Sequence, residues 1–389
     1  MKKILVFTSI FGKPYFGGAE ASISEFYKSL AELDSEILIC TLDKQFANFP
    51  ETVEFRNIQI KRFSTWLPHP VIERNESPFV LRLFSHFLGL SIGMRPFAVV
   101  KEFWNVKPDL VITHNLAGWG YVPWIVSHFL GIPVIHDNRD LYLVCIQTTK
   151  WKPKKGLCAK TCRECIPRLV ATKLAWKGGV MVTNSQYLKL EIEKNLNQKR
   201  NTHFEIVYPP IRIAANFNTA SQTKYDAVFV GRLEESKGIR EFLMASRGKG
   251  LIIGIAGVGE LREELEAEFP EVRFLGQVDG PSLMSQSRIL VVPSLWNETF
   301  GRVALEGIAA GIPVLHSNRG GLGEFKSRDG SVIIEINPED TENFALQIDL
   351  ALTKGKNEKP LETEWLESHY DHQISKFKAL VRGLLDANL

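Results

Sequence analysis

Two successive series of short, nearly uncharged, strand-like runs restrict what this chain can fold into. In the first half, runs such as KILVFTS and DLVITH alternate with helix-like stretches. After residue 210 the alternation restarts with YDAVFVG and continues through ILVVPS. Runs without charge are typical of parallel strands that helices cover on both faces. Two such series predict an α/β protein with two doubly wound, Rossmann-like domains facing each other across a cleft.

Length and linker composition place the boundary between the two domains. A chain of 389 residues is too long for one ordinary core. The polar stretch NFNTASQTK is typical of a linker, so we expect domains over residues 1–210 and 211–363. Residues 364–389 predict a helix whose large apolar side chains recur mostly every three or four positions. This helix can pack on either domain, including back on the amino-terminal one.

The net charge of +3 hides a basic first half. Residues 1–210 hold 27 Lys and Arg against 18 Asp and Glu, whereas the remainder holds 20 against 26. The segment 150–177 carries nine basic residues and one acidic residue. Such a segment is either a solvated basic loop or a surface for an acidic partner, such as an anionic membrane. We expect no nucleic acid partner.

The apolar content indicates a soluble protein. Hydrophobic residues make up 44% of the chain, and no stretch approaches the roughly 20 apolar residues of a membrane span. The start, MKKILVFTSI, lacks a small-residue cleavage site and predicts a first strand rather than a signal peptide. We therefore expect a cytoplasmic protein, peripheral at the inner face of the membrane if the basic segment docks there.

Loops that follow strands are the candidate sites, because open α/β sheets bind ligands beside the carboxyl ends of their strands. After the first strand, Gly17 and Gly18 either let a phosphate approach a helix N-terminus or simply form a tight turn. After YDAVFVG, Arg232 and Lys237 provide two cations beside a helix start. This arrangement suits a diphosphate, although surface cations are common.

The stretch WNETFGRVALEG places two carboxylates eight residues apart. Glu298 precedes a helix start and can accept hydrogen bonds from sugar hydroxyls, and Glu306 can hold ribose hydroxyls. The backbone N–H groups of Gly301, Arg302 and Val303 can bind a phosphate. Two alternatives are a solvated helix face and the acid–nucleophile pair of a glycosidase.

A histidine stands near the end of the run IPVIHDN. His136 can donate a hydrogen bond to a phosphate or lie beside a reacting centre, whereas a lone core histidine is the default. Another glycine-rich loop, NRGGLGEF, follows the run IPVLHS.

These motifs, in this order, resemble a retaining glycosyltransferase of family 4 with the GT-B architecture. The resemblance covers nearly the whole chain and is strongest over 225–335, where VGRLEESKG, ETFGRVALEG and the GG loop follow one another. GGAE and the HD of VIHDN also match, while 45–105 carries no matching motif. The resemblance implies transfer of a hexose-type sugar from a UDP- or GDP-sugar to a hydroxyl of a glycan or lipid-linked glycan, as in polysaccharide biosynthesis.

The resemblance also implies roles for the matching residues. The first domain would lie on the acceptor side, and the second would bind the donor. Glu298 would face the donor sugar and Glu306 the ribose. The remaining positions would be the diphosphate cations Arg232 and Lys237, the sugar-contacting backbone of Phe300 and Gly301, the phosphate loop at Gly17 and Gly18, and His136 beside the transferred sugar.

The implied mechanism is front-face substitution with retention, in which the leaving diphosphate helps to deprotonate the acceptor hydroxyl. Fixed cations and helix N–H groups would stabilise the charge that develops on the diphosphate. Neither glutamate need act as a general acid or base. No metal is required for catalysis, consistent with the lack of a D-x-D triplet.

Four of the five cysteines are clustered. Cys145, Cys158, Cys162 and Cys165 follow the pattern C-x12-C-x3-C-x2-C. In a cytosolic chain, clustered thiols are more typical of metal ligands than of disulfides. The cluster predicts a structural zinc site, although its first gap is long for one.

Two other functions stay open. A nucleotide-sugar epimerase can share the GT-B architecture, and a two-lobed sugar-binding protein would need no chemistry. The ETFG loop with its two glutamates favours the transferase. The cations Arg232 and Lys237 argue against the simple binder, because a free sugar carries no diphosphate.

Overall fold

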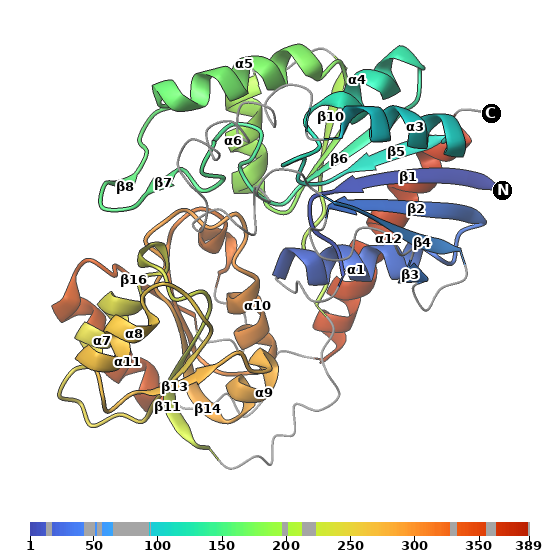
Figure 1. Cartoon of the computed structure of the whole chain (residues 1–389). Helices are drawn as coiled ribbons and strands as arrows, with labels where there is room; N and C mark the ends of the chain where they lie inside the picture. Colours follow the sequence, from blue (N-terminus) through green and yellow to red (C-terminus); the bar gives the residue numbers. More distant parts are fainter. Residues whose placement is uncertain are drawn as a thin grey trace. The chain divides into compact units, whose positions relative to one another are not determined.

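The computed structural model describes residues 1–12, 18–42, 51–52, 57–64, 93, 95–196, 201–211, 223–326, 333–354 and 363–387. The chain forms two compact units (Figure 1). Unit 1 comprises Met1–Thr148, Lys160–Pro210 and His372–Leu389, and unit 2 comprises Thr149–Ala159 and Ile211–Asp371. The polypeptide therefore passes between the units four times.

Unit 1 is built on an eight-stranded sheet with the order β10-β9-β6-β5-β1-β2-β4-β3. Neighbouring strands pair in parallel, except that β3 and β4 are antiparallel. The strands are β1 (Lys2–Thr8), β2 (Ser35–Leu42), β3 (Glu51–Thr52), β4 (Ile58–Phe63), β5 (Leu110–Thr113), β6 (Val134–Asn138), β9 (Gly179–Thr183) and β10 (Thr202–Ile206).

Both faces of this sheet are buried, which explains its nearly uncharged strands. In β1, Leu5 and Phe7 point into one core, while Ile4 and Val6 point into the other. The first core is covered by α3 (Pro96–Val106), α4 (Val122–Phe129), α5 (Ile166–Ala175) and α6 (Gln186–Leu196). The second is covered by α1 (Gly18–Leu30) and by the last helix, α12 (Thr363–Asp386).

The carboxyl-terminal half of α12 is part of unit 1. Phe377, Val381 and Leu385 are buried in the second core, and the rings of Phe26 and Phe377 lie 4.5 Å apart. Lys376 Nζ also donates to the carbonyl of Ile206, at 2.8 Å. The helical spacing seen in the sequence therefore provides a face that completes the first sheet.

Unit 2 contains a six-stranded parallel sheet with the order β13-β12-β11-β14-β15-β16. Helices α7, α8 and α11 cover one face, and α9 and α10 cover the other. The elements are β11 (Tyr225–Val230), α7 (Ile239–Ser246), β12 (Ile253–Ala256), α8 (Arg262–Glu268), β13 (Arg273–Gly276), α9 (Gly280–Ser285), β14 (Ser287–Val292), α10 (Arg302–Ala309), β15 (Val314–Ser317), β16 (Ile333–Ile336) and α11 (Thr341–Lys354).

Three 3-10 turns and a small hairpin complete the described elements. The turns are η1 (Arg163–Cys165), η2 (Glu235–Lys237) and η3 (Gly321–Glu324). The hairpin of β7 (Trp151–Lys152) and β8 (Gly156–Leu157) belongs to unit 2, where the Lys154 N–H donates to Glu235 Oε2 at 3.1 Å. Among the described residues, the helices include none long and apolar enough to cross a bilayer.

The two parallel sheets, each with helices on both faces, confirm the predicted α/β class with two Rossmann-like sheets. Helix α3 begins within the segment 45–105 that carries no matching motif, and residues 65–92 of that segment lie outside the described part of the chain.

Candidate active site

Adjacent strands of unit 2 bring the predicted donor-binding loops together. β11, β14 and β15 are neighbours in the sheet, and each precedes one of the loops singled out in the sequence. Parallel strands end at the same edge, so Lys237 after β11 meets Glu298 after β14 across 61 residues of sequence. Lys237 Nζ lies 2.7 Å from Glu298 Oε1.

Three side chains donate to the same oxygen of Glu298. Besides Lys237, Ser294 Oγ lies 2.7 Å and Trp296 Nε1 lies 3.0 Å from Oε1. Lys237 Nζ also lies 4.8 Å from the centre of the Trp296 ring, a cation–π distance. The Glu298 side chain is thus held in one orientation.

Glu298 is a carboxylate at neutral pH. Burial by itself would raise its pKa, but the Lys237 charge and the three hydrogen bonds outweigh burial, so the pKa lies below its ordinary value. A carboxyl group with a lowered pKa is a poor proton donor. Glu298 is therefore unsuited to the acid role in a glycosidase pair, because that role needs a carboxylic acid with a raised pKa.

The loop NRGGLGEF fixes the backbone of Glu298. The Gly321 N–H donates to the Glu298 carbonyl at 2.7 Å. Gly320 has a φ of +65°, and a Cβ there would overlap the same carbonyl oxygen. Glycine at this position therefore lets the two strand-end loops touch.

The helix that follows, α10, begins on a left-handed glycine. Gly301 has a φ of +96°, and a Cβ there would overlap Leu322. Phe300 is buried and packs edge-on against Phe325, with ring centres 5.2 Å apart. This tight turn aims the first N–H groups of α10, including those of Arg302 and Val303, out of the end of the helix.

The second glutamate pairs along the helix. Arg302 Nε donates to Glu306 Oε1 at 2.8 Å, one helical turn away, and both side chains are largely buried. Arg232 differs from these residues, because its side chain is 62% exposed and pairs with Glu234 at 2.8 Å. The structure thus pairs Lys237 with Glu298 and Arg302 with Glu306. Arg232, paired with Glu234, belongs to neither pair and stays largely exposed to solvent.

In unit 1, His136 lies inside the sheet. Thr113 and His136 are register partners on β5 and β6, so their side chains share a face. His136 Nδ1 lies 2.8 Å from Thr113 Oγ1, and its ring packs edge-on against Trp124. Burial and the nearby His114 lower the pKa of His136 to about 3, so its ring is neutral at physiological pH.

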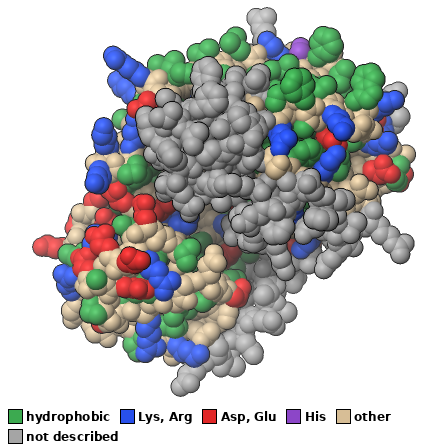
Figure 2. All heavy atoms as spheres, viewed as in Figure 1, with side chains coloured by type: hydrophobic (Ala, Val, Ile, Leu, Met, Phe, Trp, Pro, Cys, Tyr) green, Lys and Arg blue, Asp and Glu red, His purple; other side chains and the backbone are tan. Residues whose placement is uncertain are grey.

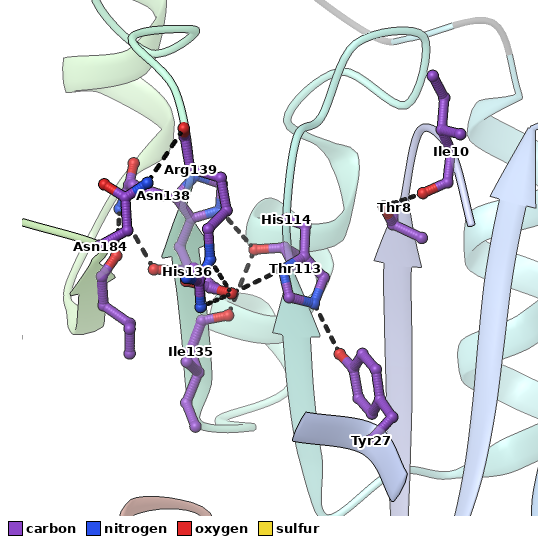
Figure 3. A network of polar contacts seen from close by, with 12 residues as sticks. Thr8, Ile10, Tyr27, Thr113, His114, Ile135, His136, Asn138, Arg139 and Asn184 are labelled. Carbon is purple, nitrogen blue, oxygen red and sulfur yellow. Dashed lines mark hydrogen bonds and ion pairs between the residues drawn. The ribbon is translucent and has the colours of Figure 1, made fainter. Parts of the chain in front are cut away.

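The opposite face of the same strands carries a buried polar chain (Figure 3). Tyr27 Oη lies 2.8 Å from His114 Nε2, and His114 Nδ1 lies 3.0 Å from Asp137 Oδ2. Arg139 Nη2 pairs with the same Asp137 oxygen at 2.9 Å. Burial would raise the pKa of Asp137, but Arg139 and His114 hold it below its ordinary value, so this carboxyl group is charged.

Sequence reasoning missed several of these residues. Ser294 and Trp296 lie four and two residues before Glu298, and only the loop conformation turns them onto its oxygen. His114 could have been singled out from the sequence, because it ends the strand-like run DLVITH, much as His136 lies near the end of the run IPVIHDN. Of the glycine pair, Gly18 is the exposed first residue of α1, and Gly17 lies outside the described residues.

The cysteine cluster is divided between the units. Cys145, Cys162 and Cys165 belong to unit 1, whereas Cys158 belongs to unit 2, where its N–H donates to the Lys150 carbonyl. Cys162 Sγ lies 3.3 Å from Cys165 Sγ. A hydrogen bond with Cys145 and burial raise the pKa of Cys165. Within the described residues, no three His, Cys, Asp or Glu side chains form a ready metal-binding group, so the zinc site stays a prediction.

Known proteins resemble this chain in sequence. The family model for glycosyl transferases group 1 matches residues 212–364. An uncharacterised glycosyltransferase of Methanocaldococcus jannaschii is 36% identical over 275 residues, which cover 64% of this chain and 67% of the relative. An uncharacterised 42.6 kDa protein in the cps region of Klebsiella pneumoniae is 27% identical over 84% of this chain and 87% of its own length.

Solved structures resemble the chain in fold. Anabaena HepE in complex with UDP-glucose superposes with a TM-score of 0.62 at 17% identity, over the full length of both chains. The fold is that of the GT-B glycosyltransferases. The chain belongs to the group 1 glycosyl transferases.

Proposed function

We propose that this glycosyltransferase is a retaining enzyme of family 4 that moves a hexose-type sugar from a UDP- or GDP-sugar to a hydroxyl of a glycan or lipid-linked glycan. The convergence of Lys237, Ser294 and Trp296 on Glu298 Oε1 carries the proposal. Because three donors use Oε1, Oε2 is the oxygen through which Glu298 would accept hydrogen bonds from sugar hydroxyls. The complex of HepE with UDP-glucose supports this class of donor.

The diphosphate would lie beside Lys237. An ammonium group has three donors, so Lys237 can hold Glu298 and a phosphate oxygen together. The N–H groups of Gly301, Arg302 and Val303 at the start of α10 would add hydrogen bonds and the positive end of the helix dipole. Arg232, which is mostly exposed, would turn onto the diphosphate, and Glu306 would accept from the ribose hydroxyls.

The reaction needs no protein acid. The bond between the anomeric carbon and the diphosphate oxygen breaks, and the acceptor oxygen bonds to the same face of that carbon. The acceptor proton passes to the departing diphosphate, whose growing negative charge Lys237 and the helix N–H groups stabilise. Glu298, with its lowered pKa, stays a charged ligand for the sugar throughout. No metal takes part in this scheme.

The acceptor would bind on unit 1, near the strand ends that carry the polar chain of Tyr27, His114 and Asp137. His136 would support this edge from within the sheet. The relative from a cps region supports a role in polysaccharide biosynthesis. We place this role at the cytoplasmic side of a membrane as part of the proposal.

A nucleotide panel tests the donor. Thermal unfolding is measured with UDP, GDP, their sugars and free sugars, with and without a chelator. We expect stabilisation by one nucleoside diphosphate, unchanged by the chelator. Stabilisation by a free sugar alone would favour the sugar-binding alternative.

Product analysis tests the chemistry. NMR of the new anomeric carbon should show the configuration of the donor. Inversion of that configuration would refute the retaining mechanism, and donor isomerisation without an acceptor would favour the epimerase.

A further inference from the structure

Unit 1 exposes an unusual number of large apolar side chains on three helices. Nine of the eighteen large hydrophobic residues that are exposed in the described chain lie on α3, α4 and α5 or their caps. Figure 2 shows hydrophobic side chains gathered along the upper edge of unit 1. We call this surface the apolar face, and its residues are Phe97, Val100, Trp104, Ile125, Phe129, Leu130, Ile166, Val170 and Leu174.

The apolar face follows helical geometry, so it is a continuous stripe on each helix. On α5, Ile166, Val170 and Leu174 recur every four residues, while Thr172 and Ala175 turn inward. On α3, Phe97, Val100 and Trp104 lie outward, opposite the buried Val99 and Phe103. Each helix thus has a second apolar side that the core does not use.

The three stripes form one surface, because the helices pack side by side on the same face of the sheet. α3 and α4 contact each other, and the inner side chains of all three helices share one core. Tyr121 Oη, at the start of α4, lies 2.6 Å from Thr172 Oγ1 of α5. The rings of Trp124 and Trp176 also pack edge-on, with centres 4.8 Å apart.

The charges on these helices favour an anionic partner. Four exposed cations, Lys101, Lys107, Arg163 and Lys177, stand on α3 or within three residues of an end of α3 or α5. Of the acidic residues within the same limits, Glu102 is buried against Lys61, Asp109 pairs with Lys2 and Glu164 is exposed. Two copies of such a surface would repel each other, whereas a bilayer with anionic headgroups attracts cations and accepts apolar side chains together.

A cavity beside the apolar face adds a place for a headgroup. It has a volume of about 330 Å³ at the amino ends of β6 and β9, and its lining includes His128, Lys177 and Gly178. Leu130 and Leu174 end their helices at this same edge of the sheet, because each helix leads directly into the next parallel strand. A phosphate bound between His128 and Lys177 would lie next to inserted apolar chains.

We infer that the apolar face is a docking surface for a bilayer that contains anionic phospholipids. α3, α4 and α5 would lie on the membrane, with Trp104 and Phe129 inserted among the headgroups and Lys101, Lys107, Arg163 and Lys177 paired with phosphates. The surface is distinct from the strand ends that carry His114 and Asp137. The inference does not depend on the identity of the donor.

Vesicle co-sedimentation tests the inference with a matched pair of double variants. Val170→Ser with Leu174→Ser alters two exposed side chains four residues apart on α5. Leu346→Ser with Leu350→Ser makes a comparable change on α11 of unit 2, with the same four-residue spacing and similar exposure. The full chain is mixed with vesicles of phosphatidylcholine, with or without phosphatidylglycerol, at low and high salt.

We expect the wild type and the α11 variant to bind vesicles that contain phosphatidylglycerol, and the α5 variant to lose about tenfold or more in partition coefficient. High salt and Lys177→Gln should weaken binding without abolishing it. Equal binding by both double variants, or no binding of the wild type, would overturn the inference. So would a dimer in size-exclusion chromatography that the α5 variant breaks with no change in vesicle binding. Nucleotide stabilisation, measured without vesicles, tests the proposed function separately.

Discussion

At the level of single residues, Lys237 would join the two halves of the proposed donor site. It lies under the Trp296 ring, donates to Glu298 and stands where the diphosphate is expected. In the proposed function, a cation in this place would link sugar binding to phosphate binding, because moving Lys237 would release Glu298 as well. The arrangement supports the proposal that the two carboxylates of WNETFGRVALEG bind the donor rather than act as acid and nucleophile.

Glu298→Gln tests this arrangement with little change in volume. The amide cannot offer Lys237 a charged partner, and it presents donors where the carboxylate accepts. We expect transfer to fall by about 100-fold or more, a loss similar to that of one preorganised polar group in an active site. Steady-state kinetics measures the loss, and circular dichroism checks the fold. Glu342→Gln, at an exposed position of α11, should leave activity unchanged.

The lowered pKa of Glu298 also predicts how stability depends on pH. A carboxyl group whose pKa is depressed in the folded state stabilises the protein above its ordinary pKa, which is 4.5 here. This stability is lost as the pH falls through the lower folded-state value. The advantage of the wild type over Glu298→Gln in free energy of unfolding should therefore be constant near pH 7 and shrink below about pH 4.5. Denaturant titrations at several pH values measure it, and a constant difference down to pH 3 would contradict the assignment.

At the scale of elements, the sequence was enough to predict the strands, but not which strand-end loops contact each other. Uncharged runs such as ILVVPS identify buried parallel strands, and the loops after them identify candidate sites. The pairing of Lys237 with Glu298 depends on β11 and β14 being neighbours, an order that the sequence does not display. The contacts of His136 were likewise not predictable from the sequence, because they depend on the register between β5 and β6. That register places His136, within β6, against Thr113 and Trp124.

The start of α10 gives a prediction for one backbone turn. Gly301→Ala would combine a positive φ with overlap against Leu322. Gly248→Ala is the matched control, because Gly248 also has a positive φ but no atom lies within 4 Å of a Cβ there. We expect both variants to be destabilised, with Gly301→Ala worse by about 1–3 kcal/mol of unfolding free energy. Equal midpoints in chemical unfolding would show that the turn relaxes freely.

The cysteine cluster gives a prediction that involves a metal. If the predicted cluster of Cys145, Cys158, Cys162 and Cys165 binds zinc, the purified protein should contain about one zinc per chain, and Cys162→Ser should lose it. Elemental analysis after dialysis measures the content, with Cys40→Ser as a control from the core of β2. A zinc content near zero in the folded wild type would exclude the site.

At the scale of the whole molecule, α12 ties the end of the chain to unit 1. Phe377 is fully buried against Phe26. Phe377→Ala should destabilise unit 1 by about 3–5 kcal/mol. Hydrogen exchange should show faster exchange in β1 and β2, with the strands of unit 2 unchanged. Arg382→Ala, exposed on the same helix, is the control, and equal acceleration in both units would show that they unfold as one.

The return of α12 has a consequence for the order in which a ribosome delivers this protein. The second core of unit 1 lacks Phe377, Val381 and Leu385 until the last part of the chain has emerged. Unit 2, although translated later, receives all its strands earlier than unit 1 receives its final helix. Until then, one apolar face of the nascent amino-terminal sheet is incompletely covered, and exposed apolar surface of this kind is prone to aggregation during synthesis.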